Sequence, residues 1–311
     1  MISKLLSRIP LVLLLLTGLP AVSAAAPFSA LYGFGDSLSD TGNISIATGG
    51  AQPPAGYDPF RFTNRAPVAV EVLGSSFGLP TAPFLGGGTN FAFGGARTGI
   101  DSFPPGLLVQ VALFNGLPGP ADDSALYFVF IGGNDVRDAA VNPSDAAAIV
   151  GQAAANIATG LELLYGDGAR SFFVPNLPNI GRTPEAIASG NPAGATALSF
   201  LFNSLLAAQL DVFAATRPDA NLYRFDTFAF LEGVIANAAA FGFTDTTSQC
   251  ILTPGCNPDA FIFWDGVHPT ARAHELLGAA MAQSIPVPEP ATLALVALGI
   301  MGLAFTRRRI R

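Results

Sequence analysis

The sequence predicts an α/β fold in which helices cover both faces of a parallel sheet. Short apolar runs alternate along the chain with longer segments of helical periodicity, and no two runs are joined by a hairpin-type turn. Continuous apolar runs are typical of parallel strands, because such strands are buried on both faces. With 311 residues, 50% of them hydrophobic, the chain can bury the core of one large domain.

The individual elements follow from apolar runs bounded by glycine, proline and small polar residues. The run that ends at Phe34 stops sharply at Gly35-Asp36-Ser37, and a later run stops at Gly132-Gly133-Asn134. Pro67 is expected at the first position of a helix, where proline is favoured. Strands are predicted at 30–34, 89–93, 125–131, 171–174, 222–225 and 261–264, a surface loop at 44–63, and helices at 67–73, 107–114, 144–165, 193–216, 228–240 and 270–284.

The first 24 residues have the order of a secretory signal peptide. Lys4 and Arg8 precede a leucine-rich run, and the small residues Ala21-Val22-Ser23-Ala24 close it, which places the cut after Ala24. The alternative is a lone N-terminal membrane anchor. Under either interpretation the main domain, residues 25–285, is exported.

The C-terminal segment, residues 286–311, is equally distinct. Pro286-Val287-Pro288-Glu289-Pro290 precedes an apolar run at 291–305 and four arginines at 307–309 and 311. The run is about 15 residues, roughly 22 Å as a helix and shorter than the ~30 Å hydrocarbon core. Arginines behind an apolar run stop transfer across the membrane. This order resembles the PEP-CTERM sorting signal of Gram-negative bacteria.

That resemblance implies a partner and a location. The partner is an exosortase-type sorting protease that cuts near Pro-Glu-Pro, after transient membrane contact through the C-terminal helix. The protein would cross the inner membrane of a Gram-negative bacterium and reach the cell surface or the extracellular matrix, or be secreted. The alternative is a permanent short transmembrane tail.

The charge and the lysine content of the chain exclude several classes of function. The chain has 15 basic and 22 acidic residues; six of the former and one of the latter lie in the terminal segments, which leaves nine arginines against 21 acids. An acidic surface repels phosphate backbones, so no nucleic-acid partner is expected. The body also lacks lysine, which excludes a Ser-Lys dyad or a Schiff base.

Cys250 and Cys256 are the only two cysteines. In an exported protein a pair at this spacing predicts a disulfide that closes a small loop. With only two histidines in the whole chain, the ligands for a metal site are too few, so none is expected.

Unusual loops follow three of the predicted strands, at Ser37, Gly95 and Asn134. Because the carboxyl ends of parallel strands meet at one edge of the sheet, we expect these loops to converge there.

A serine in such a place can also be an ordinary helix N-cap. As a nucleophile it needs a base, usually a histidine oriented by a carboxylate. His268 with Asp265 three residues earlier suits that role, although Asp-x-x-His can equally be a capping loop.

The second histidine, His274, falls inside the last predicted helix and is expected at the surface, which leaves His268 as the base. Acyl transfer also needs donors aimed at the developing oxyanion. The backbone N–H groups of Ser37 and Gly95 and the side-chain amide of Asn134 can supply three, although a turn glycine and a turn asparagine are the ordinary alternatives.

These motifs together resemble the GDSL, or SGNH, hydrolase family. The matching blocks are Gly35-Asp36-Ser37-Leu38-Ser39-Asp40, Asn90 to Ala96, Gly133-Asn134-Asp135 and Asp265-Gly266-Val267-His268-Pro269, in the order of the family. The segment 174–181 also resembles a proline-rich stretch of the longer, plant-like branch. By that resemblance Ser37 is the nucleophile, His268 the base and Asp265 its orienting partner. Ser37, Gly95 and Asn134 form the oxyanion hole, with Gly94 as the alternative to Gly95.

The resemblance also implies a fold and an activity. The fold is a flavodoxin-like α/β/α sandwich with a five-stranded parallel sheet. The activity is hydrolysis of carboxylic esters without a cofactor, on lipid, short-acyl or acetyl-sugar esters that the motifs do not distinguish. The alternatives are a non-catalytic surface or matrix protein that binds polysaccharide on the same fold, and a nucleotide-binding loop at Gly33-Phe34-Gly35, which lacks the third glycine of that fingerprint.

Overall fold

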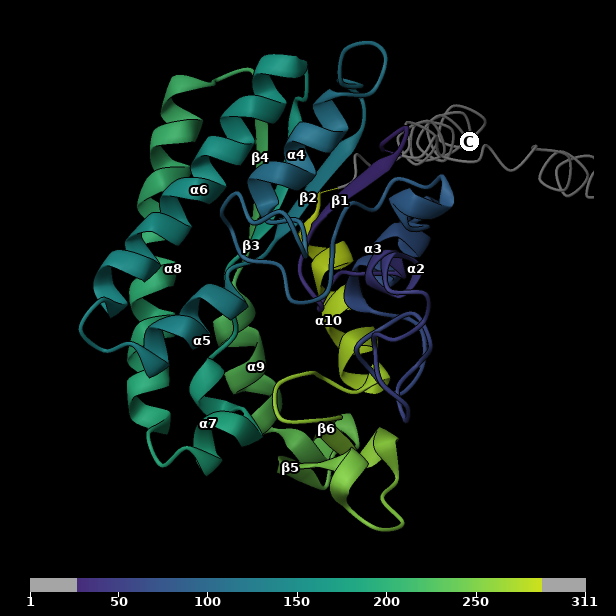
Figure 1. The fold of residues 1–311 in the computed structure, drawn as a ribbon, viewed down its shortest axis with the longest axis vertical. Helices are drawn as coiled ribbons and strands as arrows, with labels where there is room; N and C mark the ends of the chain where they lie inside the picture. The colour runs from purple at the N-terminus through teal and green to yellow at the C-terminus, as the bar shows by residue number, and fades with distance from the viewer. Residues whose placement is uncertain (1–26, 287–311) are drawn as a thin grey trace, which may run out of the picture. The chain divides into compact units, whose positions relative to one another are not determined.

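The computed structural model describes residues 27–286, so the predicted signal peptide and nearly all of the sorting segment lie outside the described residues. A four-stranded parallel sheet of order β1-β2-β3-β4 forms the centre of this region (Figure 1). Leu31 pairs with Leu126, and Leu126 pairs with Ser171, so the carboxyl ends of the strands lie along one edge. The strands are β1 (Leu31–Gly35), β2 (Leu126–Phe130), β3 (Ser171–Pro175) and β4 (Asn221–Phe225).

The predicted parallel α/β class is confirmed, but the single five-stranded sheet is wrong in its strand count. Residues 89–93 run beside β1 and exchange backbone hydrogen bonds with it, from Phe91 N–H to the Gly33 carbonyl (2.6 Å) and from Phe93 N–H to the Gly35 carbonyl (3.1 Å). They form no regular strand because Asn90 turns its own side chain back to Ala92 N–H and to the Ser39 carbonyl.

The other predicted strand, at 261–264, lies apart from the main sheet. β6 (Phe261–Phe263) pairs instead with β5 (Asp245–Gln249) in a separate two-stranded parallel sheet. A small hydrophobic cluster of Val234, Phe243, Ile262 and Phe263 supports it. β5 reads Asp-Thr-Thr-Ser-Gln, so it has no apolar run from which a strand can be predicted.

Helices cover the main sheet in two groups. On one side α4 (Leu107–Asn115), α5 (Gly133–Val141), α6 (Ala146–Asp167) and α8 (Pro192–Thr216) pack against one another, and on the other α3 (Ala69–Ser76) packs on α10 (Ala271–Ser284) (Figure 1). The second pair is unusually close: a Cβ on Gly278 would lie 2.5 Å from the Val72 Cβ. The predicted helices at 67–73, 107–114, 144–165, 193–216 and 270–284 correspond to five of these elements.

Shorter helices lie near the carboxyl edge of the sheet. They are α2 (Asn43–Ala47), α7 (Pro184–Ala188) and α9 (Thr227–Ala236). α5 also begins there, at Gly133, although a loop is predicted from Gly132-Gly133-Asn134-Asp135. Gly132 takes a positive φ of 116° as its N-cap, so the glycine turns the chain directly from β2 into a helix. Asn134 therefore lies in the first turn of α5.

Candidate active site

Ser37 lies two residues beyond the end of β1, in a tight turn. The Ser39 and Asp40 N–H groups donate to the Asp36 carbonyl (3.0 and 2.9 Å), and the Leu38 N–H donates to the Asp36 carboxylate (3.0 Å). Burial raises the pKa of Asp36 to about 6, although the hydrogen bond from the Leu38 N–H acts to lower it. Ser37 does not cap a helix, because the next helix, α2, begins at Asn43.

The turn is fixed to the sheet through Gly35. A Cβ at this position would lie 2.6 Å from the Phe130 carbonyl oxygen, so β1 and β2 can approach here only with glycine. The buried Gln110 side chain accepts from the Gly35 N–H (2.9 Å) and donates to its carbonyl (2.8 Å). The backbone that carries Ser37 is therefore held from both sides.

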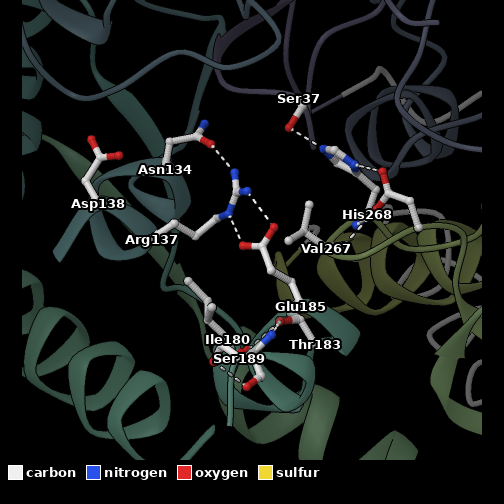
Figure 2. Close-up of polar contacts among 12 residues, drawn as sticks. Ser37, Asn134, Arg137, Asp138, Ile180, Thr183, Glu185, Ser189, Val267 and His268 are labelled. Carbon is white, nitrogen blue, oxygen red and sulfur yellow. Dashed lines mark hydrogen bonds and ion pairs between the residues drawn. The ribbon is translucent and has the colours of Figure 1, made fainter. Parts of the chain in front are cut away.

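The structure brings Ser37, His268 and Asp265 together in one hydrogen-bonded chain. His268 Nε2 lies 2.8 Å from Ser37 Oγ (Figure 2). On the other side of the ring, His268 Nδ1 lies 2.6 Å from Asp265 Oδ2. Asp265 and His268 belong to the loop between β6 and α10. Neither residue caps α10, because the N-cap of that helix is Thr270.

Asp265 is held as a carboxylate. Its Oδ1 accepts the N–H groups of Val267 (2.8 Å) and His268 (2.6 Å), and its Oδ2 accepts the Tyr57 hydroxyl (2.7 Å) besides the imidazole. Burial alone would raise the pKa of Asp265, but the hydrogen bonds from His268 and Tyr57 and the attraction to the imidazole hold it well below its usual range. An ionised Asp265 fixes the tautomer of His268 with the proton on Nδ1, which leaves Nε2 free to accept.

An aromatic ring covers the His268 imidazole. Phe62 stacks on it with ring centroids 5.1 Å apart and an interplanar angle of 29°. Any side chain at Gly94 would collide with the Phe62 ring. Gly94 therefore provides the space in which Phe62 can pack against the imidazole.

The Gly94-Gly95 turn is tied to the serine turn by Asp40. The Asp40 carboxylate accepts the Gly94 N–H (2.8 Å) and, at the start of α2, the N–H groups of Gly42, Asn43 and Ile44. The Gly94 N–H is thereby occupied. Gly95 has a φ of 79°, a conformation that glycine adopts without strain.

Asn134, in the first turn of α5, faces the cleft into which Ser37 opens. Its Nδ2 donates to the Ala96 carbonyl (2.9 Å), and its Oδ1 accepts from Arg137 (3.2 Å). Arg137 in turn forms a two-pronged ion pair with Glu185 of α7 (2.7 and 2.8 Å; Figure 2). The amide orientation is fixed by these contacts, and Nδ2 keeps a second hydrogen for a ligand.

His274 is not at the surface, so that prediction is wrong. Its side chain is fully buried between α10 and α3, where Nδ1 accepts the Ala69 N–H at the start of α3 (3.2 Å). Burial lowers its pKa to about 3, with a smaller contribution from His268. Nε2 has no hydrogen-bond partner within residues 27–286. His274 serves the packing of the helix pair and lies outside the cleft.

Several residues at the site were missed from the sequence. Tyr57 and Phe62 lie in the stretch predicted as a surface loop, and the Arg137–Glu185 pair joins two helices far apart in sequence. No motif marks them, because they act through contacts that only the fold creates. Cys250 and Cys256 are paired, with their Cα atoms 5.6 Å apart. Among residues 27–286, no group of three or more His, Cys, Asp or Glu side chains could hold a metal ion.

Comparison with known proteins places the chain in a family. Residues 31–281 match the model of the GDSL-like lipase/acylhydrolase family, and residues 286–309 match the PEP-CTERM protein-sorting motif. A GDSL esterase/lipase of Arabidopsis thaliana is 28% identical over 82% of this chain and 86% of its own length. The esterase EstA of Pseudomonas aeruginosa is 30% identical over 82% of this chain and 46% of its own length.

The chain thus spans about half the length of several curated relatives that it matches. Among solved structures, an acetylxylan esterase from Geobacillus stearothermophilus aligns with 85% of this chain and 97% of its own, at a TM-score of 0.46 and 16% identity. The match over residues 31–281 covers the four motifs and the whole of the main sheet, and on this ground the chain belongs to the GDSL-like lipase/acylhydrolase family.

Proposed function

We propose that this protein is an exported serine ester hydrolase in which Ser37, His268 and Asp265 act as a catalytic triad. The observation that carries the proposal is the unbroken hydrogen-bonded chain from Ser37 Oγ through the imidazole to the ionised Asp265. A neutral imidazole that accepts on Nε2 is the state required to take the serine proton.

In the proposed reaction Ser37 Oγ attacks the ester carbonyl carbon while its proton passes to His268 Nε2. The tetrahedral intermediate collapses as His268 returns that proton to the leaving alcohol, and the acyl group remains on Ser37. Water then attacks the acyl-enzyme with His268 as the base, and the carboxylic acid leaves. Asp265 stabilises the imidazolium in both halves of the reaction.

The negative oxygen of each intermediate needs donors, which we assign to the N–H groups of Ser37 and Gly95 and the amide of Asn134. Gly95 is preferred over Gly94 because the Gly94 N–H already donates to Asp40. The second hydrogen of Asn134 Nδ2 is available because the first goes to Ala96.

The sorting motif at 286–309 indicates export and C-terminal processing in a Gram-negative host, with an exosortase as the processing partner. We propose that the apolar C-terminal helix contacts the membrane until it is cut, and that the mature enzyme acts at the cell surface, in the matrix or after release. Intact-mass measurement of the protein from its host tests the cut: a mature chain that still ends at Arg311 contradicts it.

Replacing Ser37 by Ala tests the assigned nucleophile. We expect the hydrolysis of p-nitrophenyl acetate to fall by at least about 10⁴-fold while the fold remains. Ser39→Ala is the matched control: Ser39 is buried in the same turn, but its Oγ has no hydrogen-bond partner in the described part of the chain. The control is expected to stay within a few-fold of wild type. A Ser37→Ala enzyme within tenfold of wild type would overturn the triad.

A further inference from the structure

A second cavity adjoins the cleft into which Ser37 and His268 open. Both spaces are bounded by Leu38, Pro178, Thr183 and Val267. Leu38 directly follows Ser37, and Val267 directly precedes His268. A substrate group attached at Ser37 therefore meets the second cavity as soon as it extends past these side chains.

The walls of this cavity are apolar. α9 contributes Phe230, Leu231 and Val234, β6 contributes Ile262, and α10 contributes Leu276. No Asp, Glu, Lys, Arg or His side chain lines it. The lining has two hydroxyl groups. That of Thr183 is already used, because it accepts the Ala186 N–H and donates to the Ile180 carbonyl. That of Thr227 is buried without a hydrogen-bond partner in the described part of the chain, so it is the one hydroxyl in the lining that is left to bond a ligand. A polyhydroxylated group placed here would leave most of its hydroxyls without partners, which is costly.

The opposite end of the cleft is charged. A groove that shares Asn134, Arg137 and Ile180 with the cleft is also lined by Asp138 and Glu185 (Figure 2). The site thus offers an apolar space on one side of Ser37 and a polar, ionic one on the other. An ester has two arms, the acyl chain and the alcohol, which leave the carbonyl group in different directions. The apolar space suits a fatty acyl chain, and the polar, ionic space suits a polar alcohol.

Resting on the proposed function, we propose that the apolar cavity binds the acyl arm of the substrate, and that the enzyme acts on fatty-acyl esters of a polar alcohol in preference to acetyl esters. The acyl arm stays covalently attached through the first half of the reaction, whereas the alcohol must depart. The apolar cavity suits a retained fatty-acyl arm, and the groove that carries Arg137 and Glu185 suits a departing polar alcohol.

Acyl length gives the first test. Each methylene that enters an apolar site can add up to about fourfold to kcat/KM. Across p-nitrophenyl acetate, butyrate, hexanoate and octanoate, kcat/KM of the wild-type enzyme is expected to rise at least tenfold from acetate to its maximum. Highest activity on acetate, or on acetylated sugars, would overturn the inference while leaving a Ser37-dependent esterase in place.

Filling the cavity gives the second test. Leu231→Trp on α9 and Leu276→Trp on α10 each place an indole ring in the cavity from a different wall. Each is expected to lower kcat/KM for the octanoate ester at least tenfold and to leave the acetate ester within about threefold. Ala236→Trp is the matched control, because Ala236 lies exposed on α9 and does not line the cavity. It is expected to behave as wild type towards both esters.

The outcomes separate this inference from the proposed function. If wild-type and Ser37→Ala enzymes are equally inactive on every ester, the proposed function itself fails. If acetate hydrolysis depends on Ser37 but both tryptophan variants, folded by circular dichroism, keep the wild-type octanoate-to-acetate ratio, only the acyl assignment fails. If the variants instead lose activity on octyl acetate and keep it on the octanoate ester, the cavity holds the alcohol arm and the assignment is wrong.

Discussion

The two halves of the site are held in different ways. Ser37 and Asn134 directly follow strands of the main sheet, and Gly95 follows the segment beside β1. The fully buried side chain of Asp40 joins the serine turn to the Gly94-Gly95 turn, that of Gln110 bonds the Gly35 backbone, and Asn134 donates to the Ala96 carbonyl. Asp265 and His268 lie on the loop after β6, and their side chains keep about 13% exposure. The first half is built into the core, and the second is held at its edge.

The loop that carries the acid and the base owes its shape to a few separate contacts. The Trp264 N–H donates to the His268 carbonyl (2.8 Å), which closes the loop, and the Glu185 N–H donates to the Gly266 carbonyl (2.8 Å). Tyr57 and Phe62 hold the acid and the imidazole from the other side. Removing Asp40 or Gln110 would leave buried backbone groups of the first half unpaired and so threatens folding, whereas losing one contact of the second half should change the rate in a folded enzyme.

At Asn134 the function of the first half can be tested without unfolding the protein, because the Asn134 side chain is only half-buried. Asn134→Ala is expected to lower kcat by about 10²–10³-fold, or about 2.7–4 kcal/mol, with little change in KM, because the lost donor acts on charge that develops in the transition state. Steady-state kinetics on a p-nitrophenyl ester measure kcat and KM separately.

Two further variants sharpen that result. Asn134→Asp keeps the size but places a negative charge beside the forming oxyanion, so it should be at least as slow as the alanine enzyme. Asn142→Ala, just beyond the far end of α5, removes an amide side chain that donates to the Asp138 carbonyl and should leave kcat unchanged. An Asn134→Asp enzyme with wild-type turnover would leave Asn134 as a turn residue.

Tyr57 tests the second half with a smaller expected effect. Tyr57→Phe removes the hydroxyl that donates to Asp265, so the pKa of Asp265 rises towards its usual range and the imidazole is held less firmly. We expect kcat to fall about tenfold, equivalent to about 1.4 kcal/mol, and the loss to grow as the pH falls, because Asp265 is protonated more easily.

The chain offers a matched control for this change. Tyr165 also donates its hydroxyl to an aspartate at 2.7 Å, that of Asp219, but at an exposed site remote from the cleft. Tyr165→Phe should leave kcat and its pH profile unchanged. Equal profiles for the two variants would show that the Tyr57 hydroxyl has no part in positioning Asp265.

The two halves also differ in how far the sequence predicts them. Ser37, and the strand before it, follow from local chemistry: an apolar run, then Gly-Asp-Ser. The same logic found the strand that precedes Asn134. It failed for the separate two-stranded sheet, because β5 is polar and its pairing with β6 depends on the cluster around Phe243 and Ile262. The supports of the acid and base come from Tyr57 and Phe62, about 200 residues away, and no local pattern predicts such contacts.

His274 shows the same limit in a helix. Periodicity identifies the helix over 270–284, but it does not say that α3 packs on the face that carries His274, since Gly278 and Val72 meet only in the folded chain. A histidine near a helix start was therefore expected in solvent, whereas it accepts the orphan N–H of Ala69 in the core.

That buried histidine yields the last prediction, which concerns stability alone. In the folded protein the pKa of His274 is lowered to about 3, whereas in the unfolded chain it is about 6.5. Between these values the unfolded state binds a proton that the folded state does not, so stability is lost as the pH falls below about 6.5. By linkage this loss reaches up to about 2.7 kcal/mol at pH 4.5. His274→Asn cannot bind that proton, but its Oδ1, bonded to Cγ as Nδ1 is, can still accept the Ala69 N–H. Urea unfolding at pH 7.5 and 4.5 should show a smaller drop for the variant, with kcat at pH 7.5 unchanged. An equal drop in both proteins would mean that His274 takes up its proton without unfolding, and that the contact between α3 and α10 tolerates the charge.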